Sequence, residues 1–347
     1  MIDVFSTIQV NLSSRSYPII VGDGAVKKLP ELIPSGVRKI AVISQENIPF
    51  SLGELGGIDP EIIYVGDGES SKSLRNLESI ADQLVAKDFH RNDLIIGLGG
   101  GVVTDLAGFV ASTFHRGLSL IQVPTTLVGQ VDAAIGGKTG VNLKGGKNLV
   151  GSFFQPKAVI CDLSALSTLP EREWKNGYGE IAKYCLIGAG DLTKVPLLEQ
   201  VLRSASFKAK VVEEDEFEQS GRRAILNYGH TLAHGLEALG FASDSKASLR
   251  HGEAVSIGIA YAAKLALELG RIDESNYLEQ LNILAHFKLE TKLPAESEAN
   301  LLIEVMKRDK KSAGELTFVL DGPRGIEVVN SVPTEAVRKV LVELGAK

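Results

Sequence analysis

Short runs of mostly apolar residues alternate with amphipathic stretches along the first half of the chain. The apolar runs predict buried strands at residues 40–43, 62–65, 94–98, 118–123 and 158–161. Between two of them, Leu74 to Ala86 has the apolar spacing of an amphipathic helix. Strands separated by helix-length segments predict a parallel sheet that helices cover on both faces.

The pattern changes after Thr168-Leu169-Pro170. Long helical periodicities extend from Glu171 to Phe287, and further helix is expected from Leu301 to Val340 with one short strand near residues 316–320. At roughly 150 residues per domain, a chain of 347 residues predicts two domains. We therefore expect an α/β domain over residues 1–170 and a mostly α-helical domain over residues 171–347.

Composition narrows the class of protein. A formal net charge of -6 argues against nucleic acid as a partner, because phosphate-backbone binding needs an extended basic face. The most apolar stretch, Ala254 to Ala263, is about half of the ~20 residues that a membrane helix needs. Cys161 and Cys185 form no metal-type pair, and Met1 to Phe5 do not resemble a signal peptide, so we expect a cytoplasmic protein without membrane contact.

A glycine-rich turn follows the strand at residues 94–98. Glycines there let the backbone approach a pyrophosphate, whose negative charge suits a helix N-terminus. The turn and the start of its helix comprise Gly99, Gly100, Gly101, Val102, Val103, Thr104 and Asp105. The spacing departs from the usual Gly-x-Gly-x-x-Gly fingerprint, so a tight turn without a ligand is the alternative.

Polar side chains follow two other predicted strands, where ligands of parallel sheets collect. Asp67, Glu69 and Lys72 come after the strand that ends at Val65, and Thr125 and Thr126 come after the strand that ends at Val123. The first group offers a carboxylate for ribose hydroxyls. Ordinary polar turns are the alternative.

Residues 130–148 form a segment that is expected to link nucleotide and substrate. Asp132, Lys138, Lys147 and Asn148 lie among glycines that expose backbone N–H groups. Such groups, together with cations, bind phosphate. The alternative is a flexible, solvated loop.

Three of the six histidines lie close together in the second half of the chain. His230 and His234 are four residues apart and so share one helical face, His251 follows, and Glu180 lies upstream beside Lys183. Two imidazole nitrogens and one carboxylate around an open fourth position are typical of a catalytic zinc-type site. Taken singly, each histidine is equally compatible with a helix or interface role.

With these segments assembled, the chain resembles the 3-dehydroquinate synthases of the sugar phosphate cyclase family. The match runs from about Asp67 to Lys311 through all of these motifs and through Asp309-Lys310-Lys311. The resemblance implies an N-terminal Rossmann-like NAD domain, a mostly helical C-terminal domain, and an active site in the cleft between them. It also implies that Glu180, His230 and His251 bind one divalent ion, zinc or cobalt.

Further site residues follow from the same resemblance. Besides the glycine-rich turn, the NAD positions are Asp67, Glu69, Lys72, Thr125, Thr126, Lys138, Lys147, Ser167 and Thr168. The phosphate-side positions are Arg116, which is expected to reach across a dimer interface, Lys138, Asn148, Asn227 and His234. The carboxylate-side positions are Lys208, Arg223 and either Lys310 or Lys311, and other polar positions are Asp132, Lys183 and Glu218.

The implied substrate is a small phosphorylated sugar acid, 3-deoxy-D-arabino-heptulosonate 7-phosphate. The implied route to 3-dehydroquinate and phosphate is transient NAD-dependent oxidation, phosphate elimination, re-reduction and intramolecular aldol cyclisation, in a homodimer. One alternative is another cyclase of the family, which would not need the carboxylate-side cations together. Metal-dependent polyol dehydrogenases are a second alternative, and a non-catalytic scaffold is a third, although a scaffold would not need all three metal ligands.

Overall fold

A computed structural model describes residues 5–242, 249–309 and 316–347. The chain divides into two compact units: Met1–Glu173 with Pro196–Phe217, and Trp174–Val195 with Glu218–Lys347. The first boundary lies close to the one expected at Pro170. Helix α5, Leu197–Glu214, belongs to the first unit although the sequence placed it in the second domain, because it packs on strands β1 and β2.

The first unit is built on a seven-stranded sheet of order β1-β2-β9-β6-β5-β3-β4. All neighbours are parallel except the antiparallel pair β1 and β2. The five predicted strands are confirmed, and β1 and β2 are additional. The bounds are β1 Ser6–Val10, β2 Tyr17–Gly22, β3 Ile40–Ser44, β4 Glu61–Tyr64, β5 Leu94–Gly99, β6 Ser119–Pro124 and β9 Ala158–Asp162.

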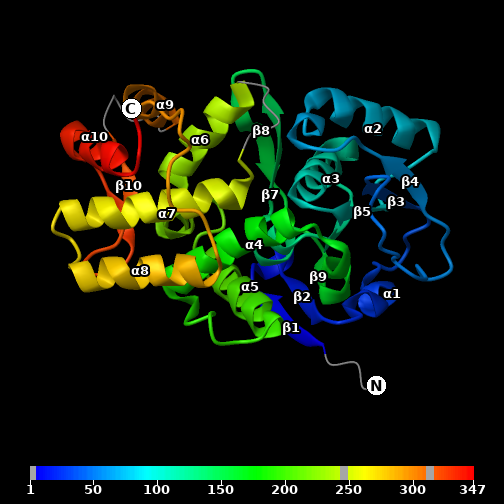
Figure 1. Ribbon diagram of the computed structural model, residues 1–347. Coiled ribbons are helices and arrows are strands. Elements are labelled where there is room, and N and C mark those ends of the chain that lie inside the picture. Colours follow the sequence, from blue (N-terminus) through cyan, green and yellow to red (C-terminus); the bar gives the residue numbers. More distant parts are fainter. Residues whose placement is uncertain (1–4, 243–248, 310–315) are drawn as a thin grey trace. The chain divides into compact units, whose positions relative to one another are not determined.

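Both faces of this sheet are buried, as parallel sheets require. On one face, Ala41 and Ile43 of β3 share an apolar cluster with helices α2, Leu74–Ala86, and α3, Gly101–Thr113. On the other face, Ile40 and Val42 share a second cluster with Leu29 of α1, Leu29–Leu32. Figure 1 shows α2 and α3 beside β3, β4 and β5. The buried core on both faces therefore holds in place the carboxyl ends of the strands, where the glycine-rich turn lies.

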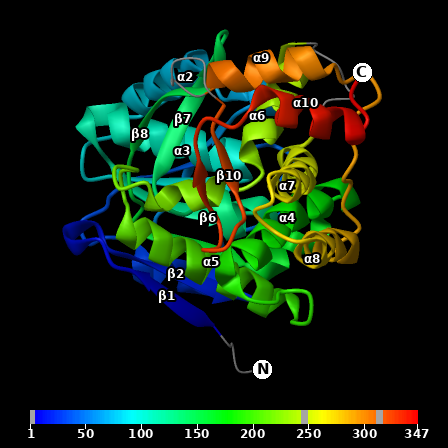
Figure 2. The same cartoon turned by 90° about the vertical axis from the view of Figure 1, so that its left-hand side faces the viewer.

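Residues 130–148, expected as a linking loop, form regular secondary structure. After a π-helical turn, Gly129–Ala133, the segment forms the antiparallel hairpin of β7, Lys138–Leu143, and β8, Gly146–Phe153 (Figure 2). The hairpin packs on α3, where a Cβ on Gly108 would lie 2.4 Å from Cγ2 of Thr139. Its phosphate-directed residues therefore stand on a strand pair and not on a flexible loop.

The second unit is mostly helical, as predicted. Its central helix, α7, is buried over most of its length and contacts α6, α8 and α10. The bounds are α4 Glu171–Tyr184, which begins in the first unit, α6 His230–Ala242, α7 His251–Glu268, α8 Glu274–His286, α9 Ala299–Asp309, α10 Thr334–Glu343, β10 Phe318–Leu320 and β11 Glu327–Val329. Strand β10 was predicted and its partner β11 was not. Among the described residues, the helices are too short or too polar to cross a membrane.

Candidate active site

Glycines bring the backbones of α4, α7 and the turn before α6 into direct contact. A Cβ on Gly179 of α4 would lie 2.3 Å from the carbonyl oxygen of Gly252, at the start of α7. A Cβ on Gly258 of α7 would lie 2.0 Å from the carbonyl oxygen of Gly229. Real Cβ atoms do not approach oxygens so closely, so only glycine fits. Glu180, His230 and His251 are the chain neighbours of Gly179, Gly229 and Gly252. The backbone contacts therefore bring the three side chains to one site.

The three predicted metal ligands do converge. One donor atom each from Glu180, His230 and His251 lies within 4.8 Å of the other two. Oε1 of Glu180 is 3.0 Å from Nε2 of His251 and 3.7 Å from Nε2 of His230. Glu180 is fully buried and His230 is buried. One carboxylate and two imidazoles at this spacing fit a divalent ion with a remaining open position.

Each imidazole is oriented through its other nitrogen. Nδ1 of His230 lies 3.1 Å from the carbonyl oxygen of Tyr228, and Nδ1 of His251 lies 3.4 Å from Oε2 of Glu237. Since both partners accept hydrogen bonds, both Nδ1 atoms carry a proton, and Nε2, on the side of Glu180, is the nitrogen left for a metal once each imidazole is neutral. This is the tautomer that a metal at this position requires.

The pKa values of the two histidines move in opposite directions in the metal-free protein. Burial, together with the charge of Lys183, lowers the pKa of His230 from 6.5 to about 3. Burial also acts to lower the pKa of His251, but the carboxylates of Glu237 and Glu180 outweigh it and raise the pKa from 6.5 to about 10. His230 is thus ready to bind a metal, whereas His251 must first lose a proton.

Other predicted residues of the second unit surround these ligands or lie nearby in the chain. Nζ of the buried Lys183 lies 2.5 Å from Oε2 of Glu180. The ring of His234 is 5.5 Å from that of His230 but belongs to no described metal cluster, and it is exposed. The buried Arg223 lies 3.8 Å from Glu218, and Asn227 ends the same short helix, Arg222–Asn227.

In the first unit, the glycine-rich turn forms as predicted between β5 and α3. A Cβ on Gly99 would meet the side chain of Val103 at 2.6 Å, and one on Gly100 would meet Cγ2 of Thr126 at 2.9 Å. Glycine is therefore required at these positions, and no side chain of Gly99 or Gly100 covers the N-terminus of α3. That end of a helix presents N–H donors and a partial positive charge, which fits a pyrophosphate.

Lys72 joins two further predicted residues. Its ammonium group forms an ion pair with Asp105 of α3 and donates a hydrogen bond to Oδ1 of Asn148 on β8. Burial raises the pKa of Asp105 and the charge of Lys72 opposes that rise. The segment after β4, the helix α3 and the hairpin thus meet at one lysine.

Asp132 and Lys208 form a second junction within the first unit. Nζ of Lys208 on α5 lies 2.9 Å from Oδ1 of Asp132 and donates to its backbone oxygen at 2.6 Å. The remaining predicted residues of this unit lie at the strand ends, on the hairpin or in the short helix Leu163–Thr168: Asp67, Glu69, Thr125, Thr126, Lys138, Lys147, Ser167 and Thr168. Lys310 and Lys311 lie outside the described residues.

Three of the predicted substrate residues have a left-handed backbone. The φ angles are +64° at Arg116, +57° at Asn148 and +57° at Glu218. Such a conformation costs about 1 kcal/mol or more for a residue other than glycine, with asparagine the most tolerant. The same backbone conformation occurs at Ser13, Asp88, His115, Lys288 and Ser331, so it does not by itself distinguish the predicted site residues.

Sequence reasoning missed three residues that position the others. Glu237 orients His251, Asn47 donates to Oδ2 of Asp67 at 2.8 Å, and Asn142 bridges Glu69 and Asn148. One sequence clue existed for Asn142, because asparagine is disfavoured within strands and here stands between Val141 and Leu143. The other two depend on contacts between segments far apart in the sequence.

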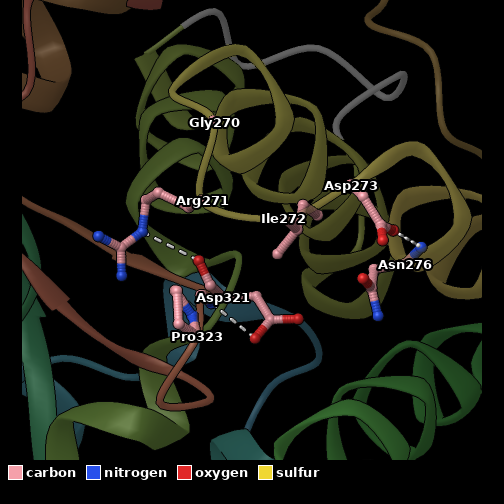
Figure 3. A pocket seen from close by; sticks show the side chains of 8 residues that line it. Gly270, Arg271, Ile272, Asp273, Asn276, Asp321 and Pro323 are labelled. Atoms are coloured by element: carbon pink, nitrogen blue, oxygen red, sulfur yellow. Dashed lines mark hydrogen bonds between the residues drawn. The ribbon is translucent and has the colours of Figure 1, made fainter.

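A hollow of about 500 Å³ lies elsewhere in the second unit, after the C-terminal end of α7. Its lining is already engaged: Nε of Arg271 donates to the backbone oxygen of Asp321, and Asp273 caps α8 through the backbone of Asn276 (Figure 3). The length of α7, about 27 Å at 1.5 Å per residue, separates it from His251. This hollow is not the candidate active site.

Comparison with known proteins matches both parts of the chain. Residues 62–176 match the 3-dehydroquinate synthase N-terminal family and residues 177–312 match the 3-dehydroquinate synthase C-terminal family. The 3-dehydroquinate synthase of Caulobacter vibrioides is 39% identical over 98% of this chain and 99% of its own length. A protein of Amycolatopsis mediterranei with the provisional name aminodehydroquinate synthase is 44% identical over 97% of this chain and 94% of its own length.

Solved structures give the same fold. A 2-deoxy-scyllo-inosose synthase complexed with carbaglucose-6-phosphate, NAD+ and Co2+ is 26% identical and superposes with a TM-score of 0.87. The superposition covers 97% of this chain and all of that one. A 2-epi-5-epi-valiolone synthase from Streptomyces hygroscopicus, 23% identical, shares the fold with a TM-score of 0.80 over 96% of this chain and 98% of that one.

Proposed function

The chain belongs to the 3-dehydroquinate synthase family, and on this premise we propose that it converts 3-deoxy-D-arabino-heptulosonate 7-phosphate to 3-dehydroquinate and inorganic phosphate. The net reaction is a carbon–oxygen lyase reaction that eliminates phosphate, and it uses NAD+ and one divalent ion, zinc or cobalt. The observation that carries the proposal is the convergence of Glu180, His230 and His251 in a chain of this family.

The second unit supplies the metal ligands. When bound, the ion polarises the alcohol that is oxidised, and NAD+ takes up one hydride and later returns it. Glu180 and the two Nε2 atoms would hold the ion, and Glu237 and the backbone of Tyr228 would keep the imidazoles in the required tautomer. Lys183 balances the negative charge of Glu180.

The first unit supplies the cofactor site. The N-terminus of α3 with Gly99, Gly100 and Gly101 fits the pyrophosphate. Asp67, held by Asn47, and Glu69, held by Asn142, present carboxylates at the end of β4, where ribose hydroxyls would bind. The other NAD positions proposed are Lys72, Asp105, Thr125, Thr126, Lys138, Lys147, Ser167 and Thr168.

Two groups of residues distinguish the two ends of the substrate. The phosphate end is assigned to Arg116, Lys138, Asn148, Asn227 and His234, and the carboxylate end to Lys208, Arg223 and one of Lys310 and Lys311. Cations that bind both ends would hold the hydroxyls between them in one orientation. Such positioning of the reacting groups accelerates the reaction. The exposed His234 is assigned to stabilise the departing phosphate.

A second candidate function rests on the relative from Amycolatopsis mediterranei, whose name gives aminodehydroquinate as the product. It is 44% identical to this chain, against 39% for the synthase of Caulobacter vibrioides. Both products retain a carboxylate, so Lys208 and Arg223 suit either substrate. The two candidates differ only in the substituent that the sugar acid carries.

One assay tests the proposal. Purified protein with NAD+ and Zn2+ or Co2+ should release inorganic phosphate from the heptulosonate phosphate without accumulation of NADH absorbance, and chelation should stop it. Steady NADH formation would point instead to a polyol dehydrogenase. Turnover of the amino substrate alone would support the second candidate, and turnover of a neutral heptulose phosphate would support another cyclase.

The hairpin supports a homodimer. Leu149 and Phe153, two residues of β8 that point to the same side, are exposed at 61% and 41%, and they form an apolar surface that a second copy of the chain would cover. Light scattering should give twice the chain mass, and Leu149→Lys with Phe153→Lys should give the monomer.

The cysteines, Cys161 and Cys185, are both unpaired, which supports a reducing compartment such as the cytoplasm.

A further inference from the structure

We propose that Asn142 is a positioning residue that couples cofactor binding to phosphate binding. The inference rests on the proposed function, because it takes Glu69 and Lys72 as cofactor residues and Asn148 as a phosphate residue. Asn142 lies in β7, is 9% exposed, and makes hydrogen bonds to all three of these residues.

The orientation of the Asn142 amide is fixed by its partners. Oδ1 accepts a hydrogen bond from the backbone N–H of Asn148 at 2.8 Å, and Nδ2 donates to Oε1 of Glu69 at 2.8 Å. The backbone N–H of Asn142 donates to the backbone oxygen of Lys72, also at 2.8 Å. A backbone N–H only donates and a carboxylate only accepts, so the amide has one orientation that satisfies both. A flipped or displaced amide would break both contacts together.

Asn148 is held in turn at both its backbone and its side chain. Its backbone has a φ of +57°, a conformation that persists only where surrounding contacts enforce it. Asn142 holds the N–H, and Lys72 donates to Oδ1. With Oδ1 occupied, the outward end of the amide is its NH2 group, which has no hydrogen-bond partner among the described residues. Lys72 and Asn142 thus make Asn148 a donor, which is what a phosphate oxygen requires.

Two partners of Asn142, Glu69 and Lys72, are the residues assigned to the cofactor. Glu69 begins one turn of helix, Glu69–Ser71, after β4, and Lys72 follows that turn directly and forms an ion pair with Asp105 of α3. A nucleotide that restrains Glu69 and Lys72 restrains Asn142, and through it the strained turn at Asn148. If NAD+ has already ordered the turn at Asn148, phosphate binding loses less conformational entropy. The two ligands should therefore bind with positive cooperativity.

The test measures binding of inorganic phosphate to the full-length, metal-loaded protein by calorimetry, with and without saturating NAD+. The wild-type Kd for phosphate should fall roughly fivefold or more when NAD+ is present. In Asn142→Ala and Asn142→Asp the two Kd values should become equal. Asn76→Ala is the matched control, because Asn76 donates to the backbone oxygen of Ser71 in the same segment without reaching the hairpin. Its cooperativity should equal that of the wild type.

Hydrogen exchange at the amide of Asn148 gives a second measurement that does not depend on turnover. NAD+ should slow this exchange in the wild type and in Asn76→Ala, and should leave it unchanged in Asn142→Ala. Independent binding of NAD+ and phosphate to a wild-type protein that turns over the heptulosonate phosphate would overturn the inference and leave the proposed function intact. A wild-type protein that binds neither ligand would overturn both, and unchanged cooperativity in both Asn142 variants would overturn the inference alone.

Discussion

The carboxylate of Glu237 lies 3.4 Å from Nδ1 of His251, on the side of the ring opposite Glu180. Partners of this kind fix the orientation and raise the basicity of a metal ligand. Glu237→Gln should therefore weaken binding of the divalent ion by about 10- to 100-fold, as measured by competition with a chelator. Glu268→Gln is the control, since Glu268 ends the same helix as His251 but pairs with Lys339 on the surface. Equal affinity in wild type and Glu237→Gln would contradict this role.

Metal binding should release about one proton at pH 7.5, because the pKa of His251 is raised to about 10 in the metal-free protein while that of His230 is already about 3. Calorimetric titration in buffers of different ionisation enthalpy measures this release. The release should vanish above pH 10. Metal binding without proton release at pH 7.5 would show that His251 is neutral before the ion arrives.

The same shift predicts the pH dependence of stability without metal. The pKa of His251 in the folded protein lies above its ordinary 6.5, so its contribution is fully present below pH 6.5 and is lost as the pH rises toward 10. Denaturant unfolding of chelator-treated protein should show this loss, and Glu237→Gln should show less of it. Equal slopes in the two proteins would contradict the assignment to Glu237.

Gly258→Ala should destabilise the second unit by about 1–3 kcal/mol, since the new Cβ would meet the carbonyl oxygen of Gly229 at 2.0 Å. Metal affinity should fall as well, because His230 follows Gly229 directly. Gly235→Ala in α6 is the control: its Cβ would make ordinary contact with Met306 at 3.5 Å and should stabilise the helix by about 0.5–1 kcal/mol. Thermal unfolding that ranks the two variants in the reverse order would refute the steric argument.

Lys208→Gln should raise the KM for the heptulosonate phosphate by about 10- to 100-fold, the value of a hydrogen bond to a charged group. The Kd for inorganic phosphate should not change, because Lys208 is assigned to the carboxylate end. Lys210→Gln, an exposed position on the same helix, should leave both values unchanged. Equal weakening of phosphate and substrate would place Lys208 at the other end of the substrate.

The sequence predicted those features that depend on local patterns. Apolar runs located the central strands, whereas the four-residue spacing paired His230 with His234, and the set Glu180, His230 and His251 came from the family resemblance. The structure confirms that this set converges and does not include His234 in it. Strand β2 was missed because it carries Pro18, which cannot donate to a sheet, and β7 and β8 were missed because glycine and lysine are poor strand formers. Glu237 acts through a partner that only the tertiary fold brings near, and the unusual strand position of Asn142 gave no indication of its partners.

Main-chain contact at Gly179, Gly252 and Gly258 also bears on the choice of ion. Zinc forms bonds of about 2.0–2.2 Å to nitrogen and oxygen, whereas calcium needs about 2.3–2.6 Å and more ligands. No side chain separates the main chains at these glycines, so the helices that carry the ligands cannot approach more closely. The backbone positions from which Glu180, His230 and His251 project are therefore set by main-chain contact, and a laboratory search for altered ion preference would gain more from exchanging the donor groups than from enlarging the space around them.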